Sequence, residues 1–267
     1  MSRPSHWPPP DDLGVRPELA APPRRVVSLV PSLTETVAVS VPGLLAGATD
    51  WCTHPADLDV PRVGGSKYPS LPAVRERRAD LVLANVEENR REDIEALRAD
   101  GIPVWVTYPR TVEEALDSLA RMLAVLGCER PDWWHEAARA WAAPAPAPSR
   151  RAVIPVWRRP WVVLGGDTFA GDVLRRLGVQ NLYDDPGDHA PARYPRPALE
   201  EIRARRPDLV VLPDEPYRFT ADDGPESFPG VPCALVSGRH LTWYGPSLAE
   251  ARDLLAIQLS TPLSSGR

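Results

Sequence analysis

Large aromatic, acidic and arginine side chains gather in the segments that follow the apolar runs of this chain. Two such segments are WRRPW at 157–161 and DEPYR at 214–218. Tryptophan and tyrosine rings on a concave surface suit a flat or bulky apolar ligand, and arginines or carboxylates can fix its polar groups. The side chains that we predict to contact such a ligand are Trp51, Tyr68, Glu88, Asn89, Arg110, Trp157, Trp161, Thr168, Glu215, Arg218, Trp243 and Tyr244.

Two histidines also follow apolar runs, where they could bind a metal together with acidic side chains. His54 and His240 would be joined by Glu87 and Asp214, because imidazole nitrogens and carboxylate oxygens are common ligands of transition metals. No histidine pair has the H-E-x-x-H spacing of a metalloprotease helix. Hydrogen-bonding or solvated roles for the same side chains stay open beside the metal site.

The motifs of common catalytic sites are absent from the sequence. There is no G-x-S-x-G turn and no cysteine beside a histidine, so no nucleophile is recognised. Residues 165–168, GGDT, lack the lysine of a phosphate-binding loop and the spacing of a dinucleotide fingerprint. A non-catalytic binding protein is therefore the leading hypothesis, and an enzyme, with or without a metal, is the alternative.

The elements that must position these side chains occur twice. Residues 76–84, ERRADLVLA, are echoed by 203–212, RARRPDLVVL, and each copy is followed by an acidic loop. Short Leu and Val runs between helical segments are typical of buried parallel strands, and ligands in such sheets bind beyond the carboxyl ends of the strands. The chain is therefore predicted to be α/β, with two Rossmann-like lobes of parallel strands and a ligand cleft between them.

Proline-rich stretches mark the predicted domain boundaries. Seven prolines between residues 4 and 23 predict an extended or disordered arm over 1–24. The N-terminal lobe would span 25–110 and the C-terminal lobe 149–267. Between them, 111–148 would hold linking helices and an Ala-Pro linker, because its closing alternation of alanine and proline cannot be helical throughout.

The bulk composition narrows the class of partner. A net charge of -5 and a pI near 5.6 argue against nucleic acid, which needs concentrated lysine and arginine. The three cysteines are widely separated and form no metal-binding motif, which suits a reducing compartment. The first residues contain no apolar signal core, and no apolar run is long enough to span a bilayer, so we expect a cytoplasmic protein without membrane insertion.

The order of several motifs resembles a known family. The segments are RRVVSLVPSLTETV from residue 24, VGGSKYPSLPAVRERRADLVLANVEENRREDIEALRADGIPVWV from 63, GGDTFAGDVLRRLGVQNLY from 165 and YPRPALEEIRARRPDLVVL from 194. Together they are similar to the periplasmic-binding-protein family for cobalamin and ferric siderophores, the ABC-importer receptors also called helical backbone metal receptors. The resemblance runs from about residue 25 to 259 and implies two α/β lobes joined by one helix.

The resemblance also implies a ligand and a partner. The expected ligand is cobalamin or a ferric chelate, held in the cleft between the lobes, and the expected protein partner is an ABC permease. Receptors of this family present one glutamate per lobe to permease arginines; Glu200 stands at that position in the second lobe and Pro72 in the first. Ser66 and Asn85 stand near positions where the cobalamin receptor has tryptophans.

Overall fold

The computed structural model describes residues 7–184 and 192–263 and separates the chain into two compact units. Unit 1 contains residues up to 109, together with 113–135 and 244–246. Unit 2 contains residues 110–112, 136–243 and 247 onward. The chain therefore enters unit 2 briefly at 110–112, passes into it again between residues 135 and 136, and returns briefly to unit 1 at 244–246.

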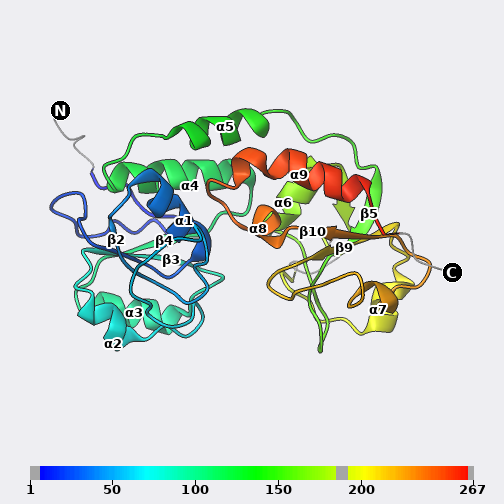
Figure 1. Cartoon of the computed structure of the whole chain (residues 1–267), viewed down its shortest axis with the longest axis horizontal. Coiled ribbons are helices and arrows are strands. Elements are labelled where there is room, and N and C mark those ends of the chain that lie inside the picture. The colour runs from blue at the N-terminus through cyan, green and yellow to red at the C-terminus, as the bar shows by residue number, and fades with distance from the viewer. Residues whose placement is uncertain (1–6, 185–191, 264–267) are drawn as a thin grey trace. The chain divides into compact units, whose positions relative to one another are not determined.

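Unit 1 is built on four short strands and the helices that cover them. Their bounds are β1 Val26–Ser28, α1 Pro31–Ser40, β2 Leu45–Ala48, α2 Leu71–Glu76, β3 Leu81–Asn85, α3 Arg91–Ala99, β4 Val104–Thr107 and α4 Val112–Val125, followed by α5 Asp132–Ala140. The strands form a parallel sheet in the order β2-β1-β3-β4. Figure 1 shows α1 and α4 on one side of this sheet and α2 and α3 on the other.

Unit 2 repeats this plan with additional short elements. Their bounds are β5 Arg150–Val153, β6 Pro155–Trp157, β7 Val162–Val163, α6 Phe169–Arg176, β8 Val179–Asn181, α7 Leu199–Ala204, β9 Leu209–Pro213, a 3-10 turn Pro225–Ser227, β10 Cys233–Val236, α8 Gly238–Thr242 and α9 Leu248–Ser260. A parallel sheet has the order β10-β9-β5-β8, and β6 and β7 form an antiparallel hairpin. Helix α7 lies on the opposite side of the sheet from α6 and α9 (Figure 1).

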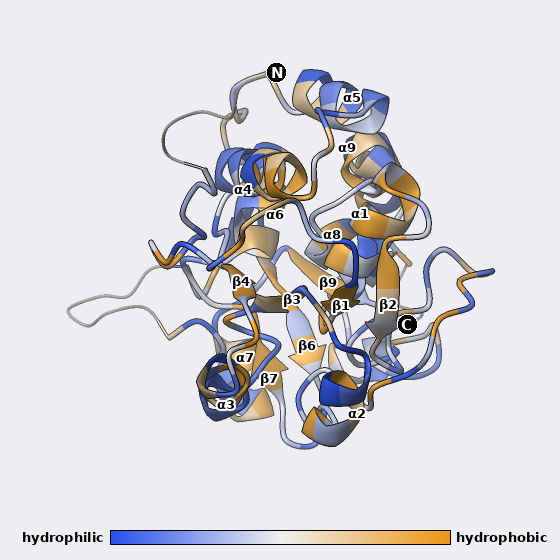
Figure 2. Ribbon diagram, turned by 90° about the vertical axis from the view of Figure 1, so that its left-hand side faces the viewer, coloured by the Kyte–Doolittle hydropathy of each residue, from blue (hydrophilic) through white to orange (hydrophobic). Residues whose placement is uncertain are grey.

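The predicted repeat is confirmed by the strands. Leu81, Val82 and Leu83 lie in β3, and Leu209, Val210 and Val211 lie in β9. Both strands are interior strands of their sheets and every one of their residues is buried, because helices cover both faces. Figure 2 colours each residue by hydropathy and shows β3 and β9 as hydrophobic and α3 as largely hydrophilic. The predicted α/β class with two parallel-sheet lobes is therefore confirmed.

Residues 7–24 differ from the disordered arm that the prolines predict. Asp11 is almost fully buried, and one of its carboxylate oxygens accepts the backbone N–H of Val106 in β4 at 3.1 Å. The backbone N–H of Asp12 donates to the Val106 carbonyl at 3.1 Å. Since β4 is an edge strand, this segment satisfies backbone groups that the sheet leaves unpaired. Residues 1–6, the start of the predicted arm, lie outside the described residues.

The other predicted boundaries also shift. The units divide between residues 135 and 136 inside α5, before the Ala-Pro stretch that was expected to separate the lobes, and residues 113–135 belong to unit 1. The reason is packing: the indole N–H of Trp133 donates to Ser40 at the end of α1, and that of Trp134 donates to the Leu116 carbonyl in α4. Within the described ranges, no helix has the length and apolar character needed to cross a membrane.

Candidate functional site

Two aromatic side chains stand exposed after the strands of unit 1. Trp51 follows β2 and is 67% exposed, and Tyr68 is 70% exposed in the loop before α2. The Arg90 guanidinium lies 4.9 Å from the centre of the Tyr68 ring, which is a cation–π distance. Gly65 lies beside Trp51, because a Cβ at that position would be 3.5 Å from the indole nitrogen. Trp51 and Tyr68 are therefore exposed rings in neighbouring loops of unit 1, and a cation lies beside the Tyr68 ring.

A buried polar network fixes the backbone next to this surface. The Asn85 amide nitrogen lies 2.7 Å from the Tyr244 hydroxyl, which also lies 2.8 Å from the hydroxyl of Thr107. Asn89 donates to the carbonyls of Leu29 and Ser66 and accepts the backbone N–H of Asn85. Burial raises the pKa of Tyr244, so its hydroxyl stays protonated.

Asn89 and Tyr244 are therefore corrected from predicted ligand contacts to structural groups. Their hydrogen-bonding capacity is used inside unit 1, and both side chains are buried. Glu87 and Glu88 lie beside them, partly exposed, with backbone N–H groups that donate to the Asn85 side chain. The two carboxylates thus remain at the strand ends where the sequence places them.

An aromatic cluster occupies the corresponding region of unit 2. Trp157, at the end of β6, is 44% exposed and meets the Tyr217 ring edge-on at 5.7 Å. Trp161 stacks on Phe219 at 6.2 Å and meets Phe228 edge-on at 5.6 Å. Trp157 is therefore placed to meet a ligand, whereas Trp161 is partly buried in the core of the unit.

Arg158, between these tryptophans, is held by acids. Its guanidinium pairs with Asp223 and Glu226, donates to Ser227 at 3.2 Å and lies 5.4 Å from the Trp161 ring centre. The Tyr217 hydroxyl donates to Asp223 at 2.6 Å. Hydrogen bonding to Tyr217, followed by the charge of Arg158, lowers the pKa of Asp223. This network orients the loop that carries Trp157 and pairs the Arg158 guanidinium, whose side chain is only 13% exposed, with carboxylates.

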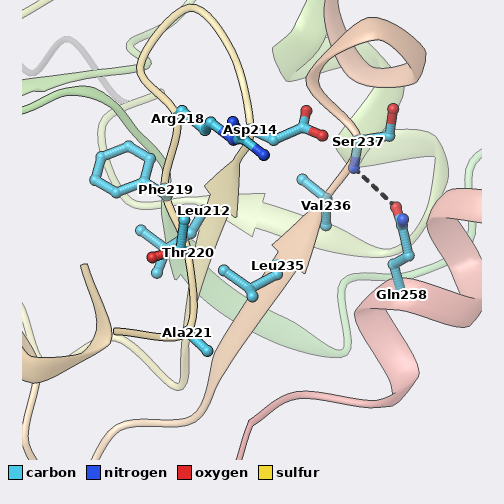
Figure 3. A pocket seen from close by; sticks show the side chains of 10 residues that line it. All are labelled: Leu212, Asp214, Arg218, Phe219, Thr220, Ala221, Leu235, Val236, Ser237 and Gln258. Atoms are coloured by element: carbon cyan, nitrogen blue, oxygen red, sulfur yellow. Dashed lines mark hydrogen bonds between the residues drawn. The ribbon is translucent and has the colours of Figure 1, made fainter. Parts of the chain in front are cut away.

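The loop after β9 contains the remaining predicted side chains of unit 2. Asp214 and Arg218 are exposed and line an open cavity of about 330 Å³, drawn in Figure 3. Glu215 is half-buried; burial, reinforced by the charge of Asp214, raises the pKa of its carboxyl. Trp243 is only 8% exposed and hydrogen-bonds Glu215, so it is corrected from a ligand contact to a core residue.

Two further predicted contacts have local roles. Thr168 caps α6: its side chain accepts the backbone N–H of Gly171 and it is buried. Arg110 is partly exposed and lies 3.8 Å from the Asp167 carboxylate. Thr168 is therefore a structural cap, while Arg110 keeps donors at the surface of unit 2.

The predicted metal ligands do not gather into a site. In residues 7–184 and 192–263, no group of three or more His, Cys, Asp and Glu side chains is arranged to hold a metal ion. His54 Nδ1 lies 3.1 Å from the hydroxyl of Thr53, and His240 bonds Ser237 and Glu250. Asp214 accepts the backbone N–H of Gly238 at 2.6 Å. The predicted ligands are divided between the units, and both ring nitrogens of His240 and one carboxylate oxygen of Asp214 are used in hydrogen bonds within unit 2.

No model of a known protein family matches the chain, but curated relatives do. The vitamin B12-binding protein of Photorhabdus laumondii is 24% identical over 207 residues, which cover 73% of this chain and 72% of the relative. The vitamin B12-binding protein of Yersinia pestis is 21% identical over 198 residues, 70% of this chain and 69% of the relative. These relatives support the resemblance of the chain to the cobalamin and siderophore type of periplasmic-binding protein.

Solved structures of this type share the fold. The periplasmic vitamin B12-binding protein of Vibrio cholerae superposes with a TM-score of 0.69 at 16% identity, covering 90% of this chain and 97% of its own. A periplasmic heme-binding protein from Roseiflexus gives 0.70 at 18% identity, over 88% and 97%. A Helicobacter pylori protein with bound Ni(II) gives 0.72 at 13% identity, over 94% and 87%. The similarity shows that the chain shares the two-lobed α/β fold of these proteins.

The positions that this receptor type implies for a permease can now be located. Glu200 lies exposed in the first turn of α7, and Pro72 lies at the start of α2. The two helices are equivalent, since each precedes the repeated strand of its unit.

Sequence reasoning missed Arg90, which contacts Tyr68, and Tyr217, which contacts Trp157. The sequence shows only that both residues follow a predicted strand. Many surface residues share this position, so it does not indicate a ligand contact.

Proposed function

We propose that the chain binds a metal chelate or a similar bulky polycyclic compound through aromatic side chains at the strand ends of each unit. The observation that carries the proposal is the exposure of Trp51 and Tyr68 in unit 1, at 67% and 70%. Two large rings this exposed in neighbouring loops of one folded unit favour a binding role. Trp157 offers a further exposed ring on unit 2.

The proposed ligand class draws on the relatives and on the charges near these rings. Vitamin B12 and heme, named for the relatives and structural neighbours, are both flat macrocycles with polar groups at the rim. A flat apolar face suits Trp51 and Tyr68. Rim carboxylates or amides suit the cationic side chains near these loops, which are Lys67 and Arg90 in unit 1 and Arg110 and Arg218 in unit 2.

Binding at these side chains requires no chemical step. In the described parts of the chain, no metal-binding group lies among them, and the relatives and neighbours are named as binding proteins.

We further propose an ABC permease as partner, contacted through Glu200 on α7, where the carboxylate is exposed. Pro72 has no charge to offer, so contact by the equivalent α2 would rest on shape and apolar surface.

The proposal is tested by titration with cyanocobalamin, hemin and a ferric catecholate chelate. Tryptophan emission should fall saturably for at least one of these compounds, since the indoles of Trp51 and Trp157 are exposed and can each meet a chromophore. A free-tryptophan sample of equal absorbance corrects for light absorbed by the ligand. Linear quenching that matches this sample for all three compounds would refute the proposed ligand class.

A further inference from the structure

A serine, a histidine and a glutamate form a hydrogen-bonded chain in unit 2. Ser237 Oγ lies 2.7 Å from His240 Nδ1, and His240 Nε2 lies 2.9 Å from Glu250 Oε1. Ser237 directly follows β10, His240 lies in α8, and Glu250 lies in the first turn of α9. The order of hydroxyl, imidazole and carboxylate is that of an activated serine, in which the acid orients the base and the base accepts the hydroxyl proton.

The proton positions follow from the partners. An ionised carboxylate only accepts hydrogen bonds, so Glu250 requires the proton of neutral His240 on Nε2. Nδ1 is then the lone-pair nitrogen and accepts the hydroxyl of Ser237. Arg239 Nη1 lies 3.7 Å from the same Glu250 oxygen and 3.4 Å from His240 Nε2. Hydrogen bonding to His240 lowers the pKa of Glu250, which keeps this carboxyl ionised.

The hydroxyl of Ser237 is not used to cap the helix that follows it. Ser237 stands at the N-cap position of α8, where a serine side chain usually accepts a backbone N–H of the first turn. Its side chain makes no such bond, and its hydroxyl instead contacts the His240 imidazole. Gly238 allows the tight turn, because a Cβ there would lie 2.8 Å from the backbone nitrogen and oxygen of Glu215.

Ser237 also lines the open cavity of about 330 Å³ described above. Gln258 Oε1 accepts the backbone N–H of Ser237 at 3.0 Å, and Figure 3 draws this hydrogen bond. The amide nitrogen of the same Gln258 side chain is a hydrogen-bond donor near the serine. Arg218 lines the same cavity. Neither this amide nitrogen nor the Arg218 guanidinium has a hydrogen-bond partner among the described residues. Both can therefore donate to the negative charge that develops on a carbonyl oxygen when a nucleophile attacks it.

We propose that Ser237 is a nucleophile toward small carboxylic esters, with His240 as its general base and Glu250 as a positioning residue. Ser237 Oγ attacks the ester carbonyl while its proton passes to His240 Nδ1. The bond between the carbonyl carbon and the leaving oxygen breaks, and the alcohol leaves with that proton, so an acyl-serine remains. Water then attacks the acyl carbon, giving its proton to His240; the acyl–Oγ bond breaks, Ser237 is re-protonated and a carboxylic acid is released.

The cavity favours short acyl groups with polar leaving groups. Its apolar lining comes from Leu212, Phe219, Ala221 and Leu235, and its polar lining from charged and amide side chains at one end. This activity lies in unit 2 alone and does not depend on the proposed ligand binding. Loss of one function would therefore leave the other measurable.

The test treats the whole chain with p-nitrophenyl acetate and with a fluorophosphonate probe, followed by intact mass and peptide mapping. We expect one acetyl or phosphonyl group per chain, mapped to Ser237, and a stoichiometric burst of p-nitrophenol. Lys67 is the single lysine of the chain, so lysine acetylation adds little background. Modification only at Lys67, the amino terminus or cysteine thiols, with Ser237 unmodified, would overturn the proposal.

Variants separate the three roles. Ser237→Ala should abolish the adduct, and His240→Gln should slow the burst at least about 100-fold. Ser260→Ala, an exposed serine in α9 whose hydroxyl bonds only the Ile257 carbonyl, is the matched control and should react like the wild type. Glu250→Gln should lower kcat about tenfold with KM unchanged, and Glu250→Asp should restore part of it. Melting curves check folding, and equal labelling of wild type and His240→Gln would contradict the assignment of the base.

Discussion

Asp208 in unit 2 repeats the backbone contacts that Asp80 makes in unit 1. The Asp80 carboxylate accepts the N–H of Arg25 at 3.0 Å, and its own N–H donates to the Arg25 carbonyl at 2.8 Å. Asp208 accepts the N–H of Arg151 at 3.0 Å and donates to the Arg151 carbonyl at 2.8 Å. In each unit the aspartate just before the central strand thus fixes the start of its neighbour strand, β1 or β5.

This contact makes stability depend on pH. The side chain of Arg151, followed by its backbone N–H, lowers the pKa of Asp208. Because the folded pKa lies below the unfolded one, the stabilisation is present above about pH 4 and is lost as the pH falls through the folded pKa. Asp208→Asn should therefore lower Tm by a few degrees at pH 7 and by progressively less below pH 4. Melting followed by circular dichroism across pH 2–7 measures this.

Asp222→Asn is the matched control for that experiment. Asp222 is an exposed aspartate of the same unit with no hydrogen bond or ion pair to other described residues. Its substitution should leave Tm within about a degree of the wild type at every pH. A constant difference between Asp208→Asn and wild type down to pH 2 would contradict a pKa-linked contribution from Asp208.

The sequence predicted the central strands because their residues are buried on both faces and leave a continuous apolar run. Val82 and Val210 illustrate this, since both are fully buried. The structured segment at 7–24 could not be predicted in the same way. Its order depends on two aspartates that satisfy the edge of β4, and a proline-rich composition gives no sign of such a partner.

A second prediction concerns this segment. The Asp12 carboxylate accepts the backbone N–H of Tyr108 at 2.6 Å, the hydroxyl of Ser118 at 2.8 Å and the guanidinium of Arg121 at 2.6 Å. Asp12→Ala leaves these donors unpaired in a mostly buried place, and should lower the free energy of unfolding by about 2–4 kcal/mol. Urea unfolding measures the change. Glu18→Ala, an exposed carboxylate in the same segment, should cost less than about 0.5 kcal/mol.

A strand-end position did not distinguish ligand contacts from structural groups. Trp51 and Trp243 both follow strands or short elements, yet one is 67% exposed and the other 8%. The difference arises from tertiary contacts, because the Trp243 side chain bonds Glu215 and lies 5.9 Å from the Arg239 guanidinium within unit 2. Ser237 was missed because its strand-to-helix turn reads SGRH and not G-x-S-x-G. Its partner Glu250 lies on a different helix.

Tyr244 provides a third prediction. Tyr244→Phe removes a buried hydroxyl and leaves the amide of Asn85 and the hydroxyl of Thr107 with one partner fewer. We expect the free energy of unfolding to fall by about 1–3 kcal/mol while ligand affinity stays within twofold of the wild type. Urea unfolding and fluorescence titration measure the two quantities. A large loss of affinity without loss of stability would return Tyr244 to the ligand contacts first predicted.

The last prediction concerns the exposed rings that carry the proposed function. Trp51→Ala and Tyr68→Ala should each weaken binding of the compound that saturates the wild type by about 1–3 kcal/mol, since each removes a ring that a flat ligand would cover. Stability should change little, because neither ring is packed in the core. Ile257→Ala, which removes an apolar side chain 63% exposed on α9, is the control and should leave the affinity unchanged. Wild-type affinity in both aromatic variants would place the binding surface elsewhere in the chain.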